Sequence, residues 1–461
     1  MGTAEAHPGP YRPLGDVAVE NAREAVPGEN GEFTYVAATN GFVVVDVQVP
    51  SDPQIVAERR GLLGDRETGP LREVQDVKVR GDRLVAAGPA NPKKGDVLMG
   101  FLLYDVSDPT NPERVAFYET AFPIHNCDLA GGFVYLTGND GERNPLVVVD
   151  VRDDEPTEVG RWSILDRDEQ WGEVAPGLRN LHDVCVQDDR AYLAHWDAGT
   201  WILDVSDPTA PTFVSRVGGR PLDELREVPD DDVRTEVVRL PGNDHYSMTD
   251  DDGDLLAINK EAWAADGEGG PGGVELWDVS EEANPTRLST IDAPPTSDPS
   301  MGGTWTTSHN LDIADGRLFT SWYQGGVKIH SLSDPENPEE LAWWRDPEEA
   351  SLWTAKLATS QFFIASSYGR DSNGRGGLYT FPNHVGQQKD APSLTATPET
   401  GTETTATEAT ATEATTTQQT TTMAETTTEE AGSAASSVPG FGISAVIAGL
   451  LGAGAWRRLQ D

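Results

Sequence analysis

Basic residues and cysteine are scarce in this sequence. Its 461 residues include 34 Lys and Arg against 77 Asp and Glu, which gives a formal net charge of −43. A surface this negative repels nucleic acid and anionic lipid head groups, so we expect no nucleic-acid partner. The acidic residues are spread along the whole chain, as is typical of proteins that fold in concentrated salt, where screening removes the self-repulsion. We therefore expect a halophilic source.

The only two cysteines, Cys127 and Cys185, are not expected to form a disulfide. They fall in neighbouring repeat units, one of them two residues and the other three residues after a histidine. Because successive side chains of a strand point to opposite faces, this difference in phase separates the two thiols. The fold must then be stable without a covalent cross-link.

Several familiar patterns are also missing. The sequence has no phosphate-cradling glycine loop, no nucleophile elbow and no zinc-protease pair of histidines, so no catalytic residue is assigned from a motif. Its N-terminus lacks a charged segment followed by an apolar stretch and is not a signal peptide as written. Since the C-terminus described below suits an exported protein, we expect that the true start lies upstream and that the export signal is missing.

Composition divides the chain into three regions. Residues 1–388 contain short apolar runs with Gly, Pro and Asp and no sustained 3.6-residue periodicity, which predicts an all-β domain. Residues 389–438 are rich in Thr, Glu and Ala and hold too little apolar surface to offset chain entropy, so we expect a disordered stalk that carries O-glycans. Residues 439–461 contain a short apolar stretch, predicted to be helical, that is followed by two arginines.

The third region has a specific order of features. Pro439, Gly440 and Phe441 follow the stalk and precede the apolar stretch and the terminal basic pair. This order resembles the PGF-CTERM sorting signal of haloarchaeal surface proteins. The resemblance implies that an archaeosortase removes the tail near Pro439 and that a lipid replaces it, which would anchor the protein on the extracellular side of the membrane. The alternative is a plain tail anchor, for which the apolar stretch is short.

An apolar run that ends in Asp recurs along the first region. Five full copies and two degenerate ones are Val43–Asp46, Leu102–Asp105, Val147–Asp150, Trp201–Asp204, Glu275–Asp278, Lys328–Ser331 and Leu378–Phe381. Most copies precede a turn that contains proline, and each interval holds about four short strands. Seven such units predict a seven-bladed β-propeller of four-stranded blades. Because the seventh unit lacks a convincing fourth strand, we expect the segment Tyr11–Val19 to help close the ring.

The apolar-Asp ending and its Ser-Asp-Pro-x-x-Pro turn resemble the LVIVD repeat family of prokaryotic surface proteins, whose members are expected to form propellers. The resemblance covers nearly all of residues 30–382. We expect the repeat Asp residues to fix turns rather than to bind ligands, since Asp caps backbone N–H groups in turns.

Four histidines share one position in the repeat. His125, His182, His245 and His309 stand at the start of the first strand of their units, where the other units carry Gly15, Gln75 and Trp353. One interpretation is structural, with each histidine bonded to a neighbouring turn. The other is a metal site, because first strands line a propeller channel and four imidazoles suit one transition metal such as Fe, Cu or Zn.

Two functions follow from these interpretations. The first is a non-catalytic interaction module, displayed at the cell surface as a monomer, that binds a protein or a glycan; a purely structural role in the cell wall is a variant of it. The second is a metal-dependent oxidoreductase with the four histidines as ligands.

The charge balance generates a first prediction. On transfer from about 2 M to about 0.1 M salt the Debye length rises from below about 3 Å to about 10 Å, so the acidic surface repels itself and the melting temperature falls. Circular dichroism at a series of salt concentrations measures this. A melting temperature that does not change with salt would contradict the assignment of the acidic surface to salt adaptation.

Overall fold

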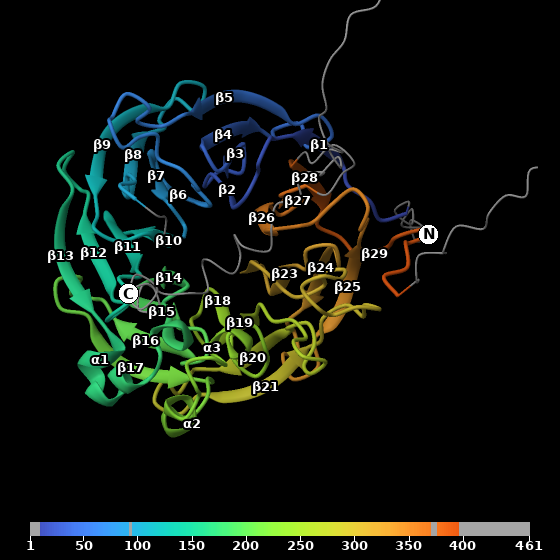
Figure 1. The fold of residues 1–461 in the computed structure, drawn as a ribbon. Helices are drawn as coiled ribbons and strands as arrows, with labels where there is room; N and C mark the ends of the chain where they lie inside the picture. The colour runs from blue at the N-terminus through green and yellow to red at the C-terminus, as the bar shows by residue number, and fades with distance from the viewer. Residues whose placement is uncertain (1–9, 92–94, 370–375, 396–461) are drawn as a thin grey trace, which may run out of the picture.

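The strands of this protein are built from short β-branched and aromatic runs whose burial depends on their place in a blade. The computed structural model describes residues 10–91, 95–369 and 376–395, which form seven sheets arranged as a ring around a central channel (Figure 1). The third strand of a blade, such as β12 (Leu146–Asp150), is buried on both faces because neighbouring blades pack against it. The outermost strand, such as β13 (Thr157–Trp162), alternates between exposed and buried positions.

Each sheet is one blade, with its first strand nearest the channel, and the seven-bladed prediction is confirmed. Blade 1 contains β2 (Ala25–Pro27), β3 (Phe33–Ala37), β4 (Gly41–Asp46) and β5 (Gln54–Arg60). Blade 2 contains β6 (Asp76–Arg80), β7 (Arg83–Gly88), β8 (Gly100–Asp105) and β9 (Glu113–Glu119). Blade 3 contains β10 (Ile124–Ala130), β11 (Phe133–Gly138), β12 and β13. Blade 4 contains β14 (Asp183–Gln187), β15 (Arg190–Ala194), β16 (Thr200–Asp204) and β17 (Thr212–Val217). Blade 5 contains β18 (Asp244–Thr249), β19 (Leu255–Lys260), β20 (Val274–Asp278) and β21 (Thr286–Ile291). Blade 6 contains β22 (Leu311–Ala314), β23 (Arg317–Ser321), β24 (Val327–Ser331) and β25 (Glu339–Trp344).

The N-terminal strand closes the ring. Blade 7 consists of β26 (Lys356–Thr359), β27 (Phe362–Ser367), β28 (Gly377–Pro382) and, outermost, β1 (Gly15–Ala18), which pairs antiparallel with β28 (Figure 1). The buried Tyr11 adds a hydrogen bond of 3.0 Å from its hydroxyl to the carbonyl oxygen of Pro382. A further strand, β29 (Gly386–Gln387), pairs parallel with β25 of blade 6. The expected closing role of the segment Tyr11–Val19 is confirmed.

A bulge recurs between the third and fourth strands of blades 1 to 6. In blade 4 the register shifts between Ile202 and Leu203, and the other five blades shift at the corresponding position. A bulge adds right-handed twist to the strand pair. This local twist comes just before the repeat Asp and suits the strong twist of a propeller blade.

The repeat Asp residues fix the turns that follow them. Oδ1 of Asp105 accepts hydrogen bonds from Ser107 N at 2.9 Å and from Ser107 Oγ at 2.6 Å. Asp204 and Asp278 make the same pair of bonds with Ser206 and Ser280. These bonds to the nearby backbone and hydroxyl groups confirm the turn role predicted from the sequence.

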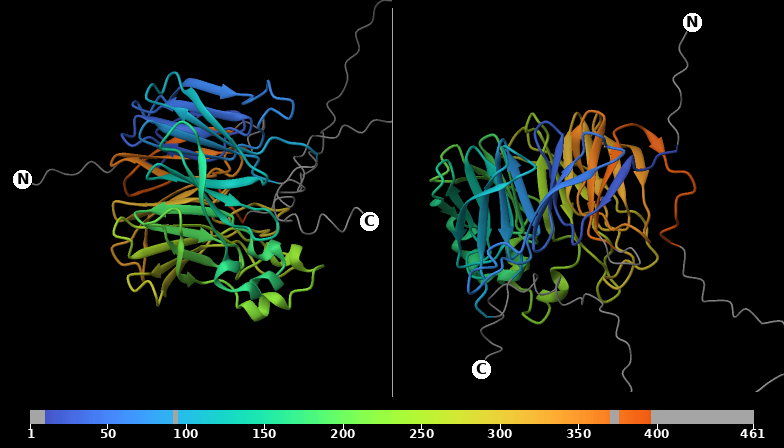
Figure 2. Two further views of the ribbon diagram at one scale, coloured as in Figure 1. Left: turned by 90° about the vertical axis from the view of Figure 1, so that its left-hand side faces the viewer. Right: turned by 90° about the horizontal axis from the view of Figure 1, so that it is seen from above.

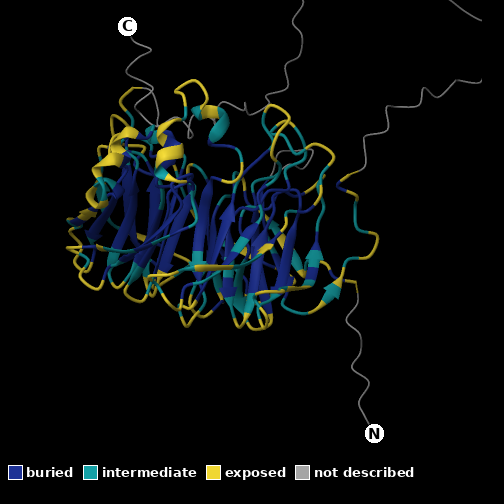
Figure 3. Cartoon of the chain, turned by 90° about the horizontal axis from the view of Figure 1, so that it is seen from below, coloured by how far each residue is buried: buried dark blue, intermediate teal, exposed yellow. Residues whose placement is uncertain are grey.

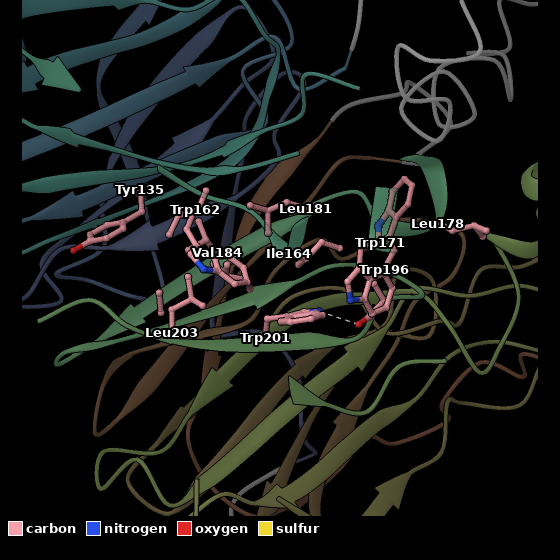
Figure 4. Close-up of a cluster of buried hydrophobic side chains, with 14 of the residues drawn as sticks. Tyr135, Trp162, Ile164, Trp171, Leu178, Leu181, Val184, Trp196, Trp201 and Leu203 are labelled. Carbon is pink, nitrogen blue, oxygen red and sulfur yellow. Dashed lines mark hydrogen bonds between the residues drawn. The ribbon is translucent and has the colours of Figure 1, made fainter. Parts of the chain in front are cut away.

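Apolar clusters between the blades form the core. In the cluster around blade 4, Trp162, Trp171 and Trp201 pack together, and Trp201 Nε1 donates to the carbonyl oxygen of Ala198 at 3.0 Å (Figure 4). The two cysteines are free and buried in different clusters, as expected. Buried residues make up most of the second strand of each blade, and many exposed ones lie in the loops at the two faces of the disc (Figure 3).

Short helices follow blades 3 and 4. They are α1 (Ile164–Arg167), the 3₁₀ helices Glu169–Glu173 and Pro176–Arg179, α2 (Leu222–Arg226) and α3 (Val233–Glu236). Ser163 and Asp166 form a capping box that starts α1. All of them lie on one face of the disc, the face at which the first strands begin (Figure 2).

No helix among the described residues is long and apolar enough to cross a membrane. Of the stalk predicted at residues 389–438, residues 396–438 lie outside the described residues, as does the sorting signal at Pro439, Gly440 and Phe441.

Removal of residues 1–19 tests the closure. Without β1, the edge of β28 is unpaired and the burial of Tyr11 is lost, so the free energy of unfolding falls by about 3 kcal/mol or more and aggregation increases. Denaturant unfolding followed by tryptophan fluorescence measures this. Removal of residues 1–9, which retains β1, is the control, and equal stability of the two truncated proteins would contradict the closing role.

Candidate metal centre

The structure brings the four predicted histidines together. They lie in blades 3 to 6, where the first strands begin around the channel. The ring centroids of His125 and His182 are 4.2 Å apart, those of His182 and His245 are 4.0 Å apart, and those of His245 and His309 are 4.5 Å apart. Neighbouring blades therefore place four imidazoles in a continuous arc.

The same position in blades 1, 2 and 7 is held by Arg23, Gln75 and Trp353. The assignment of Gly15 to this position was wrong, because Gly15 lies in β1, the outermost strand of blade 7. The backbone identifies Arg23 as the equivalent residue: its N–H donates to the carbonyl oxygen of Ala37 at 2.8 Å, just as the N–H of His182 donates to that of Ala194. Because β1 closes blade 7, the first strand of blade 1 is β2 and not β1. No pattern in the sequence indicates this assignment.

Backbone carbonyl groups fix the orientation of three imidazoles. In each, Nδ1 contacts a carbonyl oxygen, at 2.9 Å from His125 to Ala90, 3.0 Å from His182 to His245 and 2.7 Å from His309 to Trp353. A carbonyl oxygen only accepts, so Nδ1 carries the proton and Nε2 of the neutral ring keeps its lone pair. These three side chains thus link blades, as the structural interpretation expects, and the same bonds leave Nε2 free to ligate a metal.

His245 has a carboxylate partner instead. Its Nε2 lies 3.3 Å from Oε2 of Glu261, the residue that directly follows β19. The other carboxylate oxygen of Glu261 accepts a hydrogen bond from the hydroxyl group of Tyr323. Because first and second strands run antiparallel, the end of β19 lies at the same face as the start of β18, which places Glu261 beside the histidines.

Burial sets the protonation of these groups. Desolvation lowers the pKa of His125, His182 and His245, and it lowers that of His309 to about 3. Burial raises the pKa of Glu261 to about 8, against the opposing effect of the Tyr323 hydrogen bond. The imidazoles are therefore neutral at pH 7, the form that binds metals.

Among the described residues, one group of three has ligand atoms close enough together for a metal ion. It consists of His182, His245 and Glu261, whose ligand atoms all lie within 4.8 Å of one another. His125 and His309 flank this group and contact its members. Of the four histidines predicted as ligands, the structure thus places two, His182 and His245, close enough to share a metal ion, together with Glu261.

Glu261 and Arg23 were not identified from the sequence. Glu261 completes the polar run Asn259-Lys260-Glu261 at the end of β19, and such a run at the channel end of an otherwise apolar strand is the signal that identifies it. Arg23 carries no such signal, because its position depends on which strand closes the ring.

A polar layer lies next to the histidines along the first strands. Asn126 Nδ2 donates to Asp183 Oδ2 at 2.8 Å and links blades 3 and 4. The buried Glu24 of blade 1 forms an ion pair with Lys356 of blade 7 at 3.1 Å and accepts a hydrogen bond from Asn310 of blade 6. This layer connects blades that are far apart in the sequence and holds the start of each first strand in place.

Comparison with known proteins supports the repeat and the fold. Residues 30–58 and 179–218, which lie in blades 1 and 4, match the family model described as LVIVD repeat. No curated protein matches the sequence.

Among solved structures, the β-propeller domain of Cps50 (Swd1) from Myceliophteria thermophila is similar with a TM-score of 0.55 and 9% sequence identity, covering 80% of this chain and 99% of that one. A functionally unknown protein from Desulfotomaculum acetoxidans DSM 771 has a TM-score of 0.47 and 11% identity, covering 70% of this chain and 85% of that one. At 9% identity the likeness to the Cps50 (Swd1) domain shows the fold alone.

The lowered pKa of His309 predicts a pH dependence of stability. In the folded state this ring stays neutral down to about pH 3, whereas in the unfolded state it takes up a proton near pH 6.5. The contribution of His309 to the free energy of unfolding is therefore fully present above pH 6.5 and is lost as the pH falls toward 3. The difference in unfolding free energy between the wild type and His309→Asn should therefore shrink by about 1.4 kcal/mol per pH unit below about pH 6.5. Denaturant unfolding of the metal-free proteins between pH 7.5 and 5 measures it. A difference that stays constant with pH would mean that the folded protein accepts a proton at His309.

Proposed function

We propose that this chain is a metal-dependent oxidoreductase built on a β-propeller, with one transition metal held by His182, His245 and Glu261 at the mouth of the channel. The observation that carries the proposal is the convergence of two neutral imidazoles and the carboxyl group of Glu261, whose proton a metal would displace, within 4.8 Å. Two ligands about 2.1 Å from a tetrahedral metal lie about 3.4 Å apart. The 3.3 Å between His245 Nε2 and Glu261 Oε2 already has this spacing.

The donor set indicates the kind of metal and its role. Two imidazoles and one carboxylate suit Fe, Cu or Zn, and the combination with open positions is typical of non-haem iron. Three protein ligands leave coordination positions for a small molecule, as in catalytic rather than structural sites. The bond from His182 Nδ1 to a backbone carbonyl and the bond from Tyr323 to Glu261 are the supporting contacts that metal ligands need for a fixed orientation.

A second candidate function is recognition of a protein or a glycan at the face that carries α1, α2 and α3. The observation that favours it is that these insertions between blades extend that face beyond the strands (Figure 2). Loops on a rigid scaffold are common sites of recognition. In both cases we propose that the LVIVD propeller is displayed at the cell surface of a halophilic archaeon, on the stalk and sorting tail predicted from the sequence.

Metal analysis tests the proposal. Protein purified in high salt without chelators should contain one Fe, Cu or Zn per chain by elemental analysis. His245→Ala and Glu261→Gln should each weaken metal binding by at least about 100-fold, beyond the typical effect of a supporting residue. His330→Asn is the control, because His330 is buried in β24, in the part of blade 6 outside the histidine arc.

Two outcomes would change the assignment. Absence of a stoichiometric metal in the wild type, both as purified and after titration, would leave the recognition function. Equal losses of affinity in His125→Ala and His309→Ala, with no effect of Glu261→Gln, would restore the four-histidine ligand set.

A further inference from the structure

Tyr323 touches a proposed metal ligand through its hydroxyl group. The hydroxyl donates a hydrogen bond to Oε1 of Glu261, while Oε2 of the same carboxyl group lies 3.3 Å from Nε2 of His245. The tyrosine is 2% exposed, and its ring meets that of His309 edge to face, with 4.9 Å between the centroids. A single carboxyl group therefore separates the phenol from the position proposed for the metal.

Contacts between aromatic rings connect Tyr323 with less buried parts of the channel mouth. The ring of Trp305 lies edge to face with that of Tyr323 at 5.2 Å between centroids, and the ring of Tyr368 lies in the same way at 5.9 Å. Trp305 and Tyr368 are half-buried, whereas Tyr323 is buried. These rings form a path of oxidisable side chains that starts at a metal ligand and ends where solvent reaches the protein.

The hydrogen bond between Tyr323 and Glu261 also provides for a proton. A buried phenol that lost only an electron would remain as an unpaired buried cation, which its surroundings strongly disfavour. A base within hydrogen-bond reach avoids this cost, because the proton can leave together with the electron. When a metal is bound, Glu261 is a carboxylate, and its Oε1 is the acceptor that the phenol already contacts.

We propose that Tyr323 is a one-electron donor of the metal centre, with Glu261 as the acceptor of its proton and Trp305 as the next ring to be oxidised. This inference rests on the proposed metal function. It narrows the metal to Fe or Cu, because Zn²⁺ has no redox chemistry.

The oxidant of this step is a peroxide. Hydrogen peroxide takes one electron from the metal and one from Tyr323, its O–O bond breaks, and with two protons from solvent it becomes two water molecules. The phenolic O–H bond of Tyr323 breaks, its proton passes to Oε1 of Glu261, and the tyrosine becomes a neutral radical while the charge of the metal rises by one. Trp305 then returns an electron and Glu261 returns the proton, which restores Tyr323 and moves the oxidation toward solvent.

Electron paramagnetic resonance tests this role. Protein saturated with Fe²⁺ or Cu⁺ is mixed with hydrogen peroxide, frozen at once, and should show the signal of a neutral tyrosyl radical, whose hyperfine splitting changes when ring-deuterated tyrosine is incorporated. Tyr323→Phe should remove most of this signal, because phenylalanine has no O–H group to lose. Protein saturated with Zn²⁺ should give no radical, which excludes direct attack of peroxide on tyrosine.

Tyr246→Phe is the matched control. Tyr246 is 5% exposed and directly follows the proposed ligand His245, but its hydroxyl group contacts the sulfur atom of Met248 at 3.7 Å and not a carboxylate. This variant should keep the radical signal. All proteins are compared at metal saturation, because loss of a supporting hydrogen bond weakens metal binding by about 10–100-fold.

Trp305→Phe preserves the test if Tyr323→Phe fails to fold, which melting curves of all variants identify. Without the indole ring that returns an electron to Tyr323, the tyrosyl signal should decay more slowly than in the wild type. An unchanged decay would overturn the part assigned to Trp305.

The outcomes separate this inference from the metal proposal. If Fe or Cu binds but peroxide produces no tyrosyl radical, or the radical persists in Tyr323→Phe, the donor role is wrong and the metal function stands. If the protein binds no stoichiometric metal, the metal function fails and the donor role fails with it. A radical that is present in the wild type and in Tyr246→Phe but absent from Tyr323→Phe supports both.

Discussion

The ring depends on carboxylates that bridge one blade to the next at the channel. Asp76 in blade 2 accepts a hydrogen bond from the N–H of Cys127 in blade 3 at 2.8 Å, Asp128 accepts one from Val186 of blade 4 at 2.7 Å, and Asp312 does the same for Leu357 of blade 7 at 2.8 Å. The first strand of each blade has an unpaired edge toward the channel, and its N–H groups need acceptors. A hydrogen bond to a charged group contributes about 1.5–3 kcal/mol, so these links both satisfy the edge and fix the angle between blades.

The histidines also link neighbouring blades, but as hydrogen-bond donors instead of acceptors. Where the Asp residues accept from the next blade's N–H groups, His182 and His309 donate from Nδ1 to the next blade's carbonyl oxygens. A bond made for assembly therefore also selects the tautomer of the ring and leaves Nε2 for another use. The structural and the metal interpretations are therefore compatible for His125, His182 and His309, because the same inter-blade bond that links the blades would orient Nε2 toward a metal.

The repeat was predictable because its signals are local: an apolar run, an Asp that caps the next turn and a fixed position for histidine all appear within one unit. The site was predictable only where it followed the repeat. Glu261 occurs in a single blade, and its approach to His245 depends on the antiparallel pairing of β18 and β19. Arg23 was missed because Gly15 was taken for the start of blade 1, and pairing of β1 with β28 is a contact between the two ends of the domain. The stalk and the sorting tail stay predictions, since nearly all of the stalk and the whole tail lie outside the described residues.

Several departures from sevenfold symmetry fall in one part of the ring. The four histidines belong to blades 3 to 6, Glu261 to blade 5, and α1, α2 and α3 follow blades 3 and 4. The opposite face carries Asp-capped turns that repeat with little change. The histidines and the helical insertions occur on one side only, where burial keeps the imidazoles neutral and the carbonyl contacts of His125, His182 and His309 leave Nε2 with a free lone pair. Asymmetry, burial and candidate ligand atoms coincide at the mouth of the channel, and this coincidence is the basis of the metal centre that we propose there.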